Sequence, residues 1–103
     1  MKYNLEYRIK FLKEELAELE TAYNNSDLAE VIDALIDLCY VSIGTGILMG
    51  VNWDKHWAEV QRANMEKIRV TSSTDSKRGH SFDVKKPTFW VPPQHTSILR
   101  GEL

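Results

Sequence analysis

The chain has 103 residues, of which 43% are hydrophobic and 27% charged, the composition of an ordinary globular domain. Thirteen Lys and Arg against fifteen Asp and Glu leave a formal net charge of −2, which argues against a general nucleic-acid binder. We therefore expect no nucleic-acid partner. The length allows one domain with a modest core. The single cysteine, Cys39, excludes an internal disulfide framework and fits a reducing cytosol, so we expect a cytoplasmic protein.

The N-terminus is charged and amphipathic and has no apolar signal-peptide core, so we expect no targeting segment. The most apolar run, 38–51, covers fourteen residues, fewer than the roughly 20 that span a bilayer. We expect this run to lie in a buried helix, and we expect no membrane partner.

A first helix is expected from about residue 5 to residue 23, with Asn4 as its N-cap. Its apolar side chains recur at alternating steps of four and three, which places them in one stripe: Leu5, Ile9, Leu12, Leu16, Leu19 and Tyr23. The polar residues 24–26 then interrupt the pattern.

A second helix is expected from about residue 27 to residue 49. Asp27 and Glu30 have the spacing of an N-cap and its capping-box partner, and Gly50 suits the position after the last turn. Beyond Leu38 the helix is apolar nearly all round, which indicates burial from several sides. Asn52 is the expected N-cap of a third helix over about 53–68.

From residue 70 the periodic pattern stops. Residues 71–80 are rich in Ser, Thr, Lys and Arg and are typical of a mobile loop. Three prolines exclude a long helix in the tail, so we expect an extended strap that packs its aromatic residues, including Phe89 and Trp90, on the helices. We therefore divide one domain into a helical part, 1–69, and a loop and strap, 70–103.

The segregation of charge is the strongest indication of function. Residues 14–54 contain nine acids and no Lys or Arg. On a helical wheel Glu30, Asp33 and Asp37 form a stripe roughly 60° wide, and Glu15 and Glu18 flank the apolar stripe of the first helix. If the two helices form an antiparallel hairpin, the acidic sides of the first and second helix could face each other.

Converging carboxylates without a base must be protonated, exposed or neutralised by a cation. Oxygen ligands of this kind suit Mg²⁺ or Mn²⁺. The alternative is a solvated acidic face on which Glu30 is only a capping partner, and the spacing alone leaves both interpretations open.

The acids also form a known motif. Residues 14–18, Glu-Glu-Leu-Ala-Glu, match E-E-x-x-E, and residues 30–33, Glu-Val-Ile-Asp, match the following E-x-x-D. In this order the chain resembles the all-α nucleoside triphosphate pyrophosphohydrolases, in their MazG-like, phosphoribosyl-ATP pyrophosphohydrolase-like branch. Residues 33–41, 59–67 and the tail from Lys86 resemble that branch as well. Some branches place the second acidic pair where this chain has Ala34 and Asp37, so Glu30, Asp33 and Asp37 all stay candidates.

The resemblance implies an all-α fold: an antiparallel helical hairpin and a third helix that form a four-helix-type core in a homodimer or homotetramer, with an extended C-terminal tail. It implies hydrolysis of a nucleoside or deoxynucleoside triphosphate to the monophosphate and pyrophosphate, with Mg²⁺ or alternatively Mn²⁺. The implied metal ligands are Glu15, Glu18, Glu30, Asp33 and Asp37. The implied catalytic residues are Glu14 and Glu15, with Glu14 as acceptor of the proton of the attacking water.

Asn64 and Lys67 are the expected substrate contacts on the third helix, with Tyr40 and Arg62 as further candidates. The alternatives are that Asn64 bridges helices and that Lys67 interacts with the helix dipole. Four basic residues of the tail could close over a triphosphate or form a solvated loop: Lys77, Arg78, Lys85 and Lys86.

For several other conspicuous residues we expect a structural role and no part in binding or catalysis. The Gly44-Thr45-Gly46 segment indicates close helix packing, Cys39 is an expected inert core residue, and the three histidines are expected to be isolated. The alternative function for the whole chain is a non-catalytic helical dimerisation or regulatory module with a vestigial acidic face.

Overall fold

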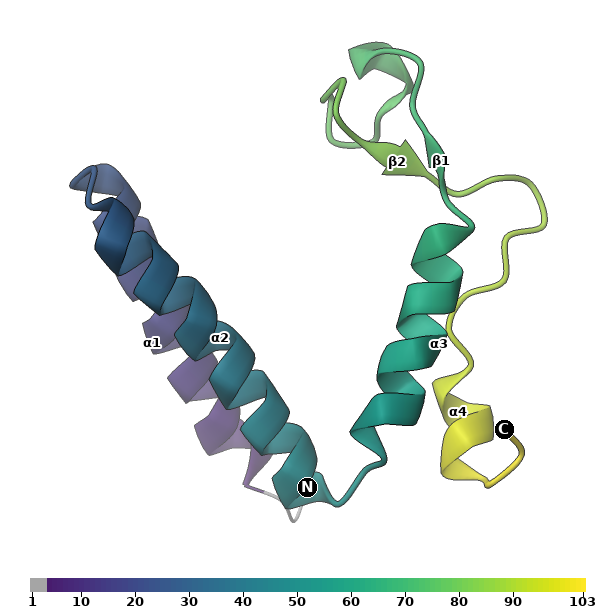
Figure 1. Cartoon of the computed structure of the whole chain (residues 1–103), viewed down its shortest axis with the longest axis horizontal. Helices are drawn as coiled ribbons and strands as arrows, with labels where there is room; N and C mark the ends of the chain where they lie inside the picture. The colour runs from purple at the N-terminus through teal and green to yellow at the C-terminus, as the bar shows by residue number, and fades with distance from the viewer. Residues whose placement is uncertain (1–3) are drawn as a thin grey trace. The chain divides into compact units, whose positions relative to one another are not determined.

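The structure is a computed structural model that describes residues 4–103. The chain divides into two compact units, Met1–Trp53 and Asp54–Leu103. The elements, in chain order, are α1 (Leu5–Asn24), α2 (Leu28–Met49), α3 (Trp53–Met65), β1 (Ile68–Arg69), the 3₁₀ helix η1 (Ser73–Asp75), β2 (Val84–Lys85) and α4 (His95–Leu99) (Figure 1). The expected helical hairpin followed by a third helix is confirmed. The division at residue 69 stays a prediction.

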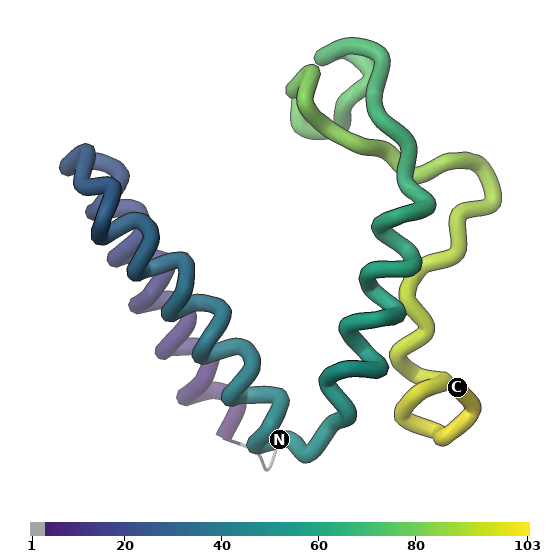
Figure 2. Tube along the Cα trace, in the orientation of Figure 1, coloured from purple at the N-terminus to yellow at the C-terminus, as the bar shows by residue number. Residues whose placement is uncertain are grey.

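The N-terminal unit is the hairpin, in which α1 and α2 run side by side (Figures 1 and 2). At its turn the backbone N–H of Asp27 donates to the carbonyl of Ala22 at 3.0 Å. The Asp27 carboxylate then accepts from the backbone N–H of Glu30 at 3.2 Å, which confirms the expected N-cap. Gly50 ends α2 at φ 70°, also as expected. Asn4 is wrong as a side-chain cap, because its backbone is left-handed and its side chain makes no capping hydrogen bond.

Small residues let the two helices approach. Ala22, Ala34 and Val41 are buried between them. The Arg8 side chain joins α1 to α2, since its Nε donates to Thr45 Oγ1 at 3.0 Å and its Nη2 donates to the Val41 carbonyl at 3.1 Å. These contacts fix how α1 lies along α2.

The expected close packing at the glycines is confirmed. A Cβ at Gly44 would lie 3.0 Å from the Arg8 guanidinium, and a Cβ at Gly46 would collide with the Trp53 ring. Gly46 is therefore required by the space that Trp53 occupies.

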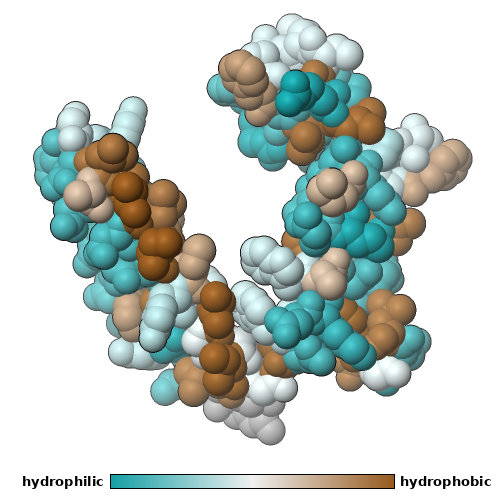
Figure 3. All heavy atoms as spheres, in the orientation of Figure 1, coloured by the Kyte–Doolittle hydropathy of each residue, from teal (hydrophilic) through white to brown (hydrophobic). Residues whose placement is uncertain are grey.

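One hairpin does not bury the apolar half of α2. Within the described residues Ile36, Ile47 and Leu48 are all more than half exposed, and Cys39 is exposed rather than in a core. Brown apolar side chains accordingly form a stripe along the hairpin in Figure 3. By length and composition α2 could also cross a membrane, a weak indication that the core helix of a soluble protein gives as well.

In the C-terminal unit α3 ends at Met65, earlier than expected, because the chain turns there into β1. β1 pairs antiparallel with β2, with Ile68 opposite Lys85 and Arg69 opposite Val84. This β-hairpin was not expected, because two-residue strands have no periodicity to detect. The connecting loop contains η1 and is held by side-chain hydrogen bonds, among them Thr71 N–H to the Asp75 carboxylate at 3.0 Å.

The strap lies along α3 in the opposite direction. The Trp90 indole N–H donates to the Ala63 carbonyl at 2.7 Å, and the Gln94 backbone N–H donates to Glu59 at 2.7 Å. The expected packing of aromatics is thus confirmed for Trp90 and wrong for Phe89, which is 96% exposed. His56 and His95 are not isolated, because their Nδ1 atoms lie 2.8 Å apart where α4 meets α3.

Candidate metal centre

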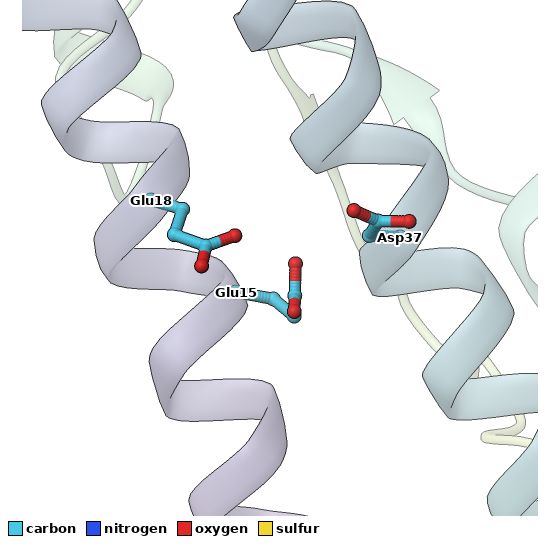
Figure 4. Close-up of side chains that lie close together, drawn as sticks. All are labelled: Glu15, Glu18 and Asp37. Carbon is cyan, nitrogen blue, oxygen red and sulfur yellow. The ribbon is translucent and has the colours of Figure 1, made fainter.

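Three carboxylates converge on the hairpin. Glu15 and Glu18 extend from α1, and Asp37 extends toward them from α2 (Figure 4). One oxygen of each lies within 4.8 Å of the others. The spacing of three residues puts Glu15 and Glu18 on one face of α1, and the packing of the hairpin brings Asp37 opposite them. We call these three residues the acidic cluster.

Glu15 is the buried member of the acidic cluster, whereas Asp37 is half-buried and Glu18 is exposed. The Glu15 Oε2 atom is buried without a hydrogen-bond partner. Burial raises the pKa of the Glu15 carboxyl above its ordinary value, and the negative charges of Glu18 and Asp37 raise it further. No Lys or Arg within residues 4–103 forms an ion pair with the cluster. The carboxylates therefore repel one another without a compensating base.

The acidic cluster suits a hard divalent cation. All of its donors are carboxylate oxygens, which are the ligands that Mg²⁺ and Mn²⁺ prefer. A buried carboxylate oxygen without a partner is costly, and a cation would satisfy it. The exposed side at Glu18 would leave such a cation accessible to a ligand from solvent.

The two alternatives for the second acidic pair, Glu30 with Asp33 or the positions of Ala34 and Asp37, lie in different surroundings. Ala34 is buried one turn before Asp37, on the side of α2 that faces α1. Glu30 and Asp33 are exposed, and neither joins the acidic cluster. The Glu30 side chain instead lines, with Glu18 and others, a cavity of about 330 Å³ near the hairpin turn. Of the three candidates, therefore, only Asp37 belongs to the acidic cluster.

Two other candidates on the hairpin lie outside the acidic cluster. Glu14 is exposed and lines a separate shallow cavity together with Lys10 and Phe11. Tyr40 follows Asp37 by three residues and is 79% exposed. Neither side chain is held by a hydrogen bond to another described residue, so both are accessible to a ligand.

The remaining candidates lie in the C-terminal unit. Arg62 is engaged, because its guanidinium bonds Glu59 at 2.9 Å and Glu66 at 3.2 Å. It also donates to the strap carbonyls of Val91 and Pro92, at 3.2 Å each. The hydrogen bond from Arg62, followed by that from the Gln94 backbone N–H, holds the pKa of the Glu59 carboxyl below its ordinary value. Arg62 therefore fixes the strap to α3.

Asn64 and Lys67 lie at the end of α3. The Asn64 carbonyl accepts the backbone N–H of Lys67 at 3.1 Å, and the Asn64 side chain is exposed. The Lys67 ammonium lies 5.4 Å from the centre of the Trp90 ring, and the Lys86 ammonium lies 4.9 Å from it. Sequence reasoning missed this arrangement, because it depends on the path of the strap.

Comparison with known proteins adds two findings. The sequence model for phosphoribosyl-ATP pyrophosphohydrolase matches residues 2–64, which include α1, α2 and nearly all of α3. The chain is also similar to "Uncharacterized protein L479" of Acanthamoeba polyphaga mimivirus, with 43% identity over 47 residues. That similarity covers 46% of this chain and 19% of the viral protein, so the chain corresponds to a minor part of that relative.

Proposed function

The chain belongs to the phosphoribosyl-ATP pyrophosphohydrolase family, and we propose that it hydrolyses a nucleoside or deoxynucleoside triphosphate to the monophosphate and pyrophosphate. The family consists of nucleotide pyrophosphohydrolases within the MazG-like all-α superfamily. The observation that carries the proposal is the acidic cluster, which lies inside the matched region and contains a buried carboxylate oxygen without a partner.

In this proposal Glu15, Glu18 and Asp37 bind Mg²⁺ or alternatively Mn²⁺. When bound, such a cation neutralises phosphate oxygens and lowers the pKa of a coordinated water. Glu15 anchors the site from its buried position, and the exposed Glu18 leaves one side open to the triphosphate. We assign Glu14 to accept the proton of the attacking water. This assignment rests on the E-E-x-x-E motif alone, because the Glu14 side chain lies outside the acidic cluster.

For substrate binding we propose Tyr40, Asn64 and Lys67. Tyr40 and Asn64 are exposed, and Lys67 is a cation without a carboxylate partner among residues 4–103. An aromatic ring, an amide and an ammonium suit a base, a sugar and a phosphate, respectively. Arg62 is not included, because the strap and two carboxylates engage its guanidinium.

We also propose that two copies of the chain associate through their hairpins. The support is the exposed apolar stripe on α2, since contiguous exposed apolar side chains often mark a protein–protein interface. A four-helix core built from two hairpins would cover it.

We also propose a cytoplasmic location, because the exposed Cys39 thiol suits a reducing compartment.

One observation favours the alternative of a non-catalytic helical module. Ala34 occupies a position of α2 that faces α1, where some branches of the superfamily carry an acid. The acidic cluster therefore has three carboxylates rather than four. A module of this kind predicts a folded oligomer that hydrolyses no nucleotide.

The test is pyrophosphate release from a panel of canonical and modified nucleoside triphosphates, with Mg²⁺, Mn²⁺ or EDTA. We expect release of pyrophosphate and the matching monophosphate only with a divalent cation, and loss of release in Glu18→Gln. Glu20→Gln, an exposed acid on the same helix, is the matched control and should keep full activity. Release of orthophosphate would contradict the assigned bond, and no release by folded protein across the panel would favour the module.

A further inference from the structure

We propose that the C-terminal unit contains a pocket, which includes the proposed substrate contact Lys67 and binds the phosphate groups of small di- and triphosphates without a divalent cation. The pocket has a volume of about 450 Å³ and lies at the base of the β-hairpin. Its charged lining is Lys67, Lys77, Arg78, Lys85, Lys86 and one acid, Asp75. We call it the basic pocket, and all of its residues lie beyond the family match at 2–64.

The charge of the basic pocket is not balanced internally. Arg78 forms an ion pair with Asp83, and Lys85 forms one with Asp75 at 2.7 Å. In the described part of the chain the other three cations, Lys67, Lys77 and Lys86, have no carboxylate partner. Three ammonium groups around one cavity leave an excess of positive charge that an anion would neutralise.

Hydrogen bonds hold the wall of the basic pocket in place. Asp75 accepts from the backbone N–H of Thr71 as well as from Lys85, and Asp83 accepts from the Ser76 hydroxyl at 2.6 Å as well as from Arg78. These contacts lower the pKa of both carboxyls below the ordinary range. The two ion pairs thus brace the loop between β1 and β2.

Trp90 positions Lys67 and Lys86, which lie on the side of the basic pocket away from the braced loop. Its ring is fixed by the indole hydrogen bond to the Ala63 carbonyl at 2.7 Å. The ammonium groups of Lys67 and Lys86 lie 5.4 and 4.9 Å from the ring centre, within the range of cation–π attraction. These lysines come from segments on either side of the β-hairpin, so the ring holds both of them beside the same cavity.

The volume and the charged side chains of the basic pocket indicate which class of ligand it binds. The volume of about 450 Å³ falls in the roughly 300–1,000 Å³ range of small-ligand pockets. Lysines bind phosphate as point charges and can meet several phosphate groups at once. The choice of nucleotide-derived di- and triphosphates over other polyanions rests on the proposed function, whose substrate and product carry these groups. The basic pocket contains one acid, itself paired with Lys85, so we expect no metal requirement.

The test is calorimetric titration of the full chain with inorganic triphosphate and pyrophosphate in EDTA. We expect saturable binding that weakens with added salt. Lys77→Gln and Lys86→Gln should each weaken it about tenfold, the loss typical of one charged contact. Lys77→Arg should retain binding. Lys10→Gln, which removes a lysine from α1, is the matched control and should bind like the unaltered chain.

Several outcomes would overturn the proposal. These are unchanged affinity in Lys77→Gln and Lys86→Gln with unaltered melting temperatures, equal affinity for sulfate and triphosphate, or tighter binding of a single-stranded oligonucleotide. The Glu18→Gln variant separates this proposal from the proposed function. If it binds triphosphate in EDTA but hydrolyses none, the basic pocket binds phosphate groups without the acidic cluster. If the unaltered chain hydrolyses nucleotides but binds no triphosphate in EDTA, only the basic pocket is refuted.

Discussion

Glu15 and Asp37 bring carboxylate oxygens within 4.8 Å of each other across the hairpin, although neither forms an ion pair with a base in residues 4–103. Repulsion of this kind persists in a folded protein only where other interactions outweigh it. Here the packing of α1 on α2 and the Arg8 contacts to Val41 and Thr45 hold the helices together. The repulsion in the acidic cluster thus lowers the stability of the fold, as is common at functional sites.

The first prediction concerns Glu15 and pH. Because its folded-state pKa is raised, the protonated carboxyl stabilises the fold at low pH, and this contribution is lost as pH rises above the ordinary value of 4.5 and through the raised pKa. Glu15→Gln should therefore raise the melting temperature of metal-free protein more at about pH 8 than at about pH 5. Melting curves in EDTA test this. An equal effect at both values would show that ionisation of Glu15 costs no stability.

The second prediction concerns stabilisation by metal. A cation at 100 times its dissociation constant should raise the free energy of unfolding by about 2.7 kcal/mol. Denaturant titrations with and without Mg²⁺ measure this difference. We expect the gain in the unaltered chain and in Glu20→Gln, and its loss in Asp37→Asn. A flat response to Mg²⁺ and Mn²⁺ in the unaltered chain would favour the non-catalytic module.

The third prediction separates the two registers of the second acidic pair. Asp37 belongs to the acidic cluster, whereas Asp33 is exposed one turn earlier on α2. Asp37→Asn should abolish metal-dependent pyrophosphate release, and Asp33→Asn should reduce it by less than a factor of about three, the usual size of a surface effect. Equal loss in both variants would mean that the ligand set extends to Asp33.

The fourth prediction concerns the packing of the hairpin end. A methyl group at residue 46 would collide with the Trp53 ring, so Gly46→Ala should destabilise the fold by about 1–3 kcal/mol, the usual cost of overpacking. Gly44→Ala is the milder comparison, because its added Cβ meets only Arg8 Nη2, at 3.0 Å. That variant should lose less stability, since Ala favours a helix over Gly and offsets part of any disturbance of the Arg8 hydrogen bonds. Urea titration of both variants measures the contrast, and similar midpoints would contradict it.

The hairpin and the two caps of α2 could be predicted because periodicity and capping are local properties. Glu15 and Glu18 could be paired from their spacing on one helix. Asp33 and Asp37 could not be separated, because residues one turn apart differ by only about 40° around the helix axis and their choice depends on packing. In the structure Asp37, and not Asp33, lies with Glu15 and Glu18 in the acidic cluster.

The C-terminal unit was less accessible to sequence reasoning. Strands β1 and β2 have two residues each, too few for an alternating pattern. The His56–His95 contact and the two lysines at Trp90 depend on the path of the strap along α3, which no local pattern encodes. Phe89 was wrong as a packed aromatic, because the chain turns it outward at a left-handed backbone position, φ 64°.

We propose above all that Glu15, Glu18 and Asp37 together bind a catalytic divalent cation. Titration with Mn²⁺, followed by its electron paramagnetic resonance signal, tests this most directly because it needs no knowledge of the substrate. The account predicts saturable binding to the unaltered chain and to Glu20→Gln, and a loss of at least about tenfold in affinity in Glu18→Gln and Asp37→Asn, the effect of removing one charged ligand contact. Unchanged Mn²⁺ affinity in both folded variants would contradict it.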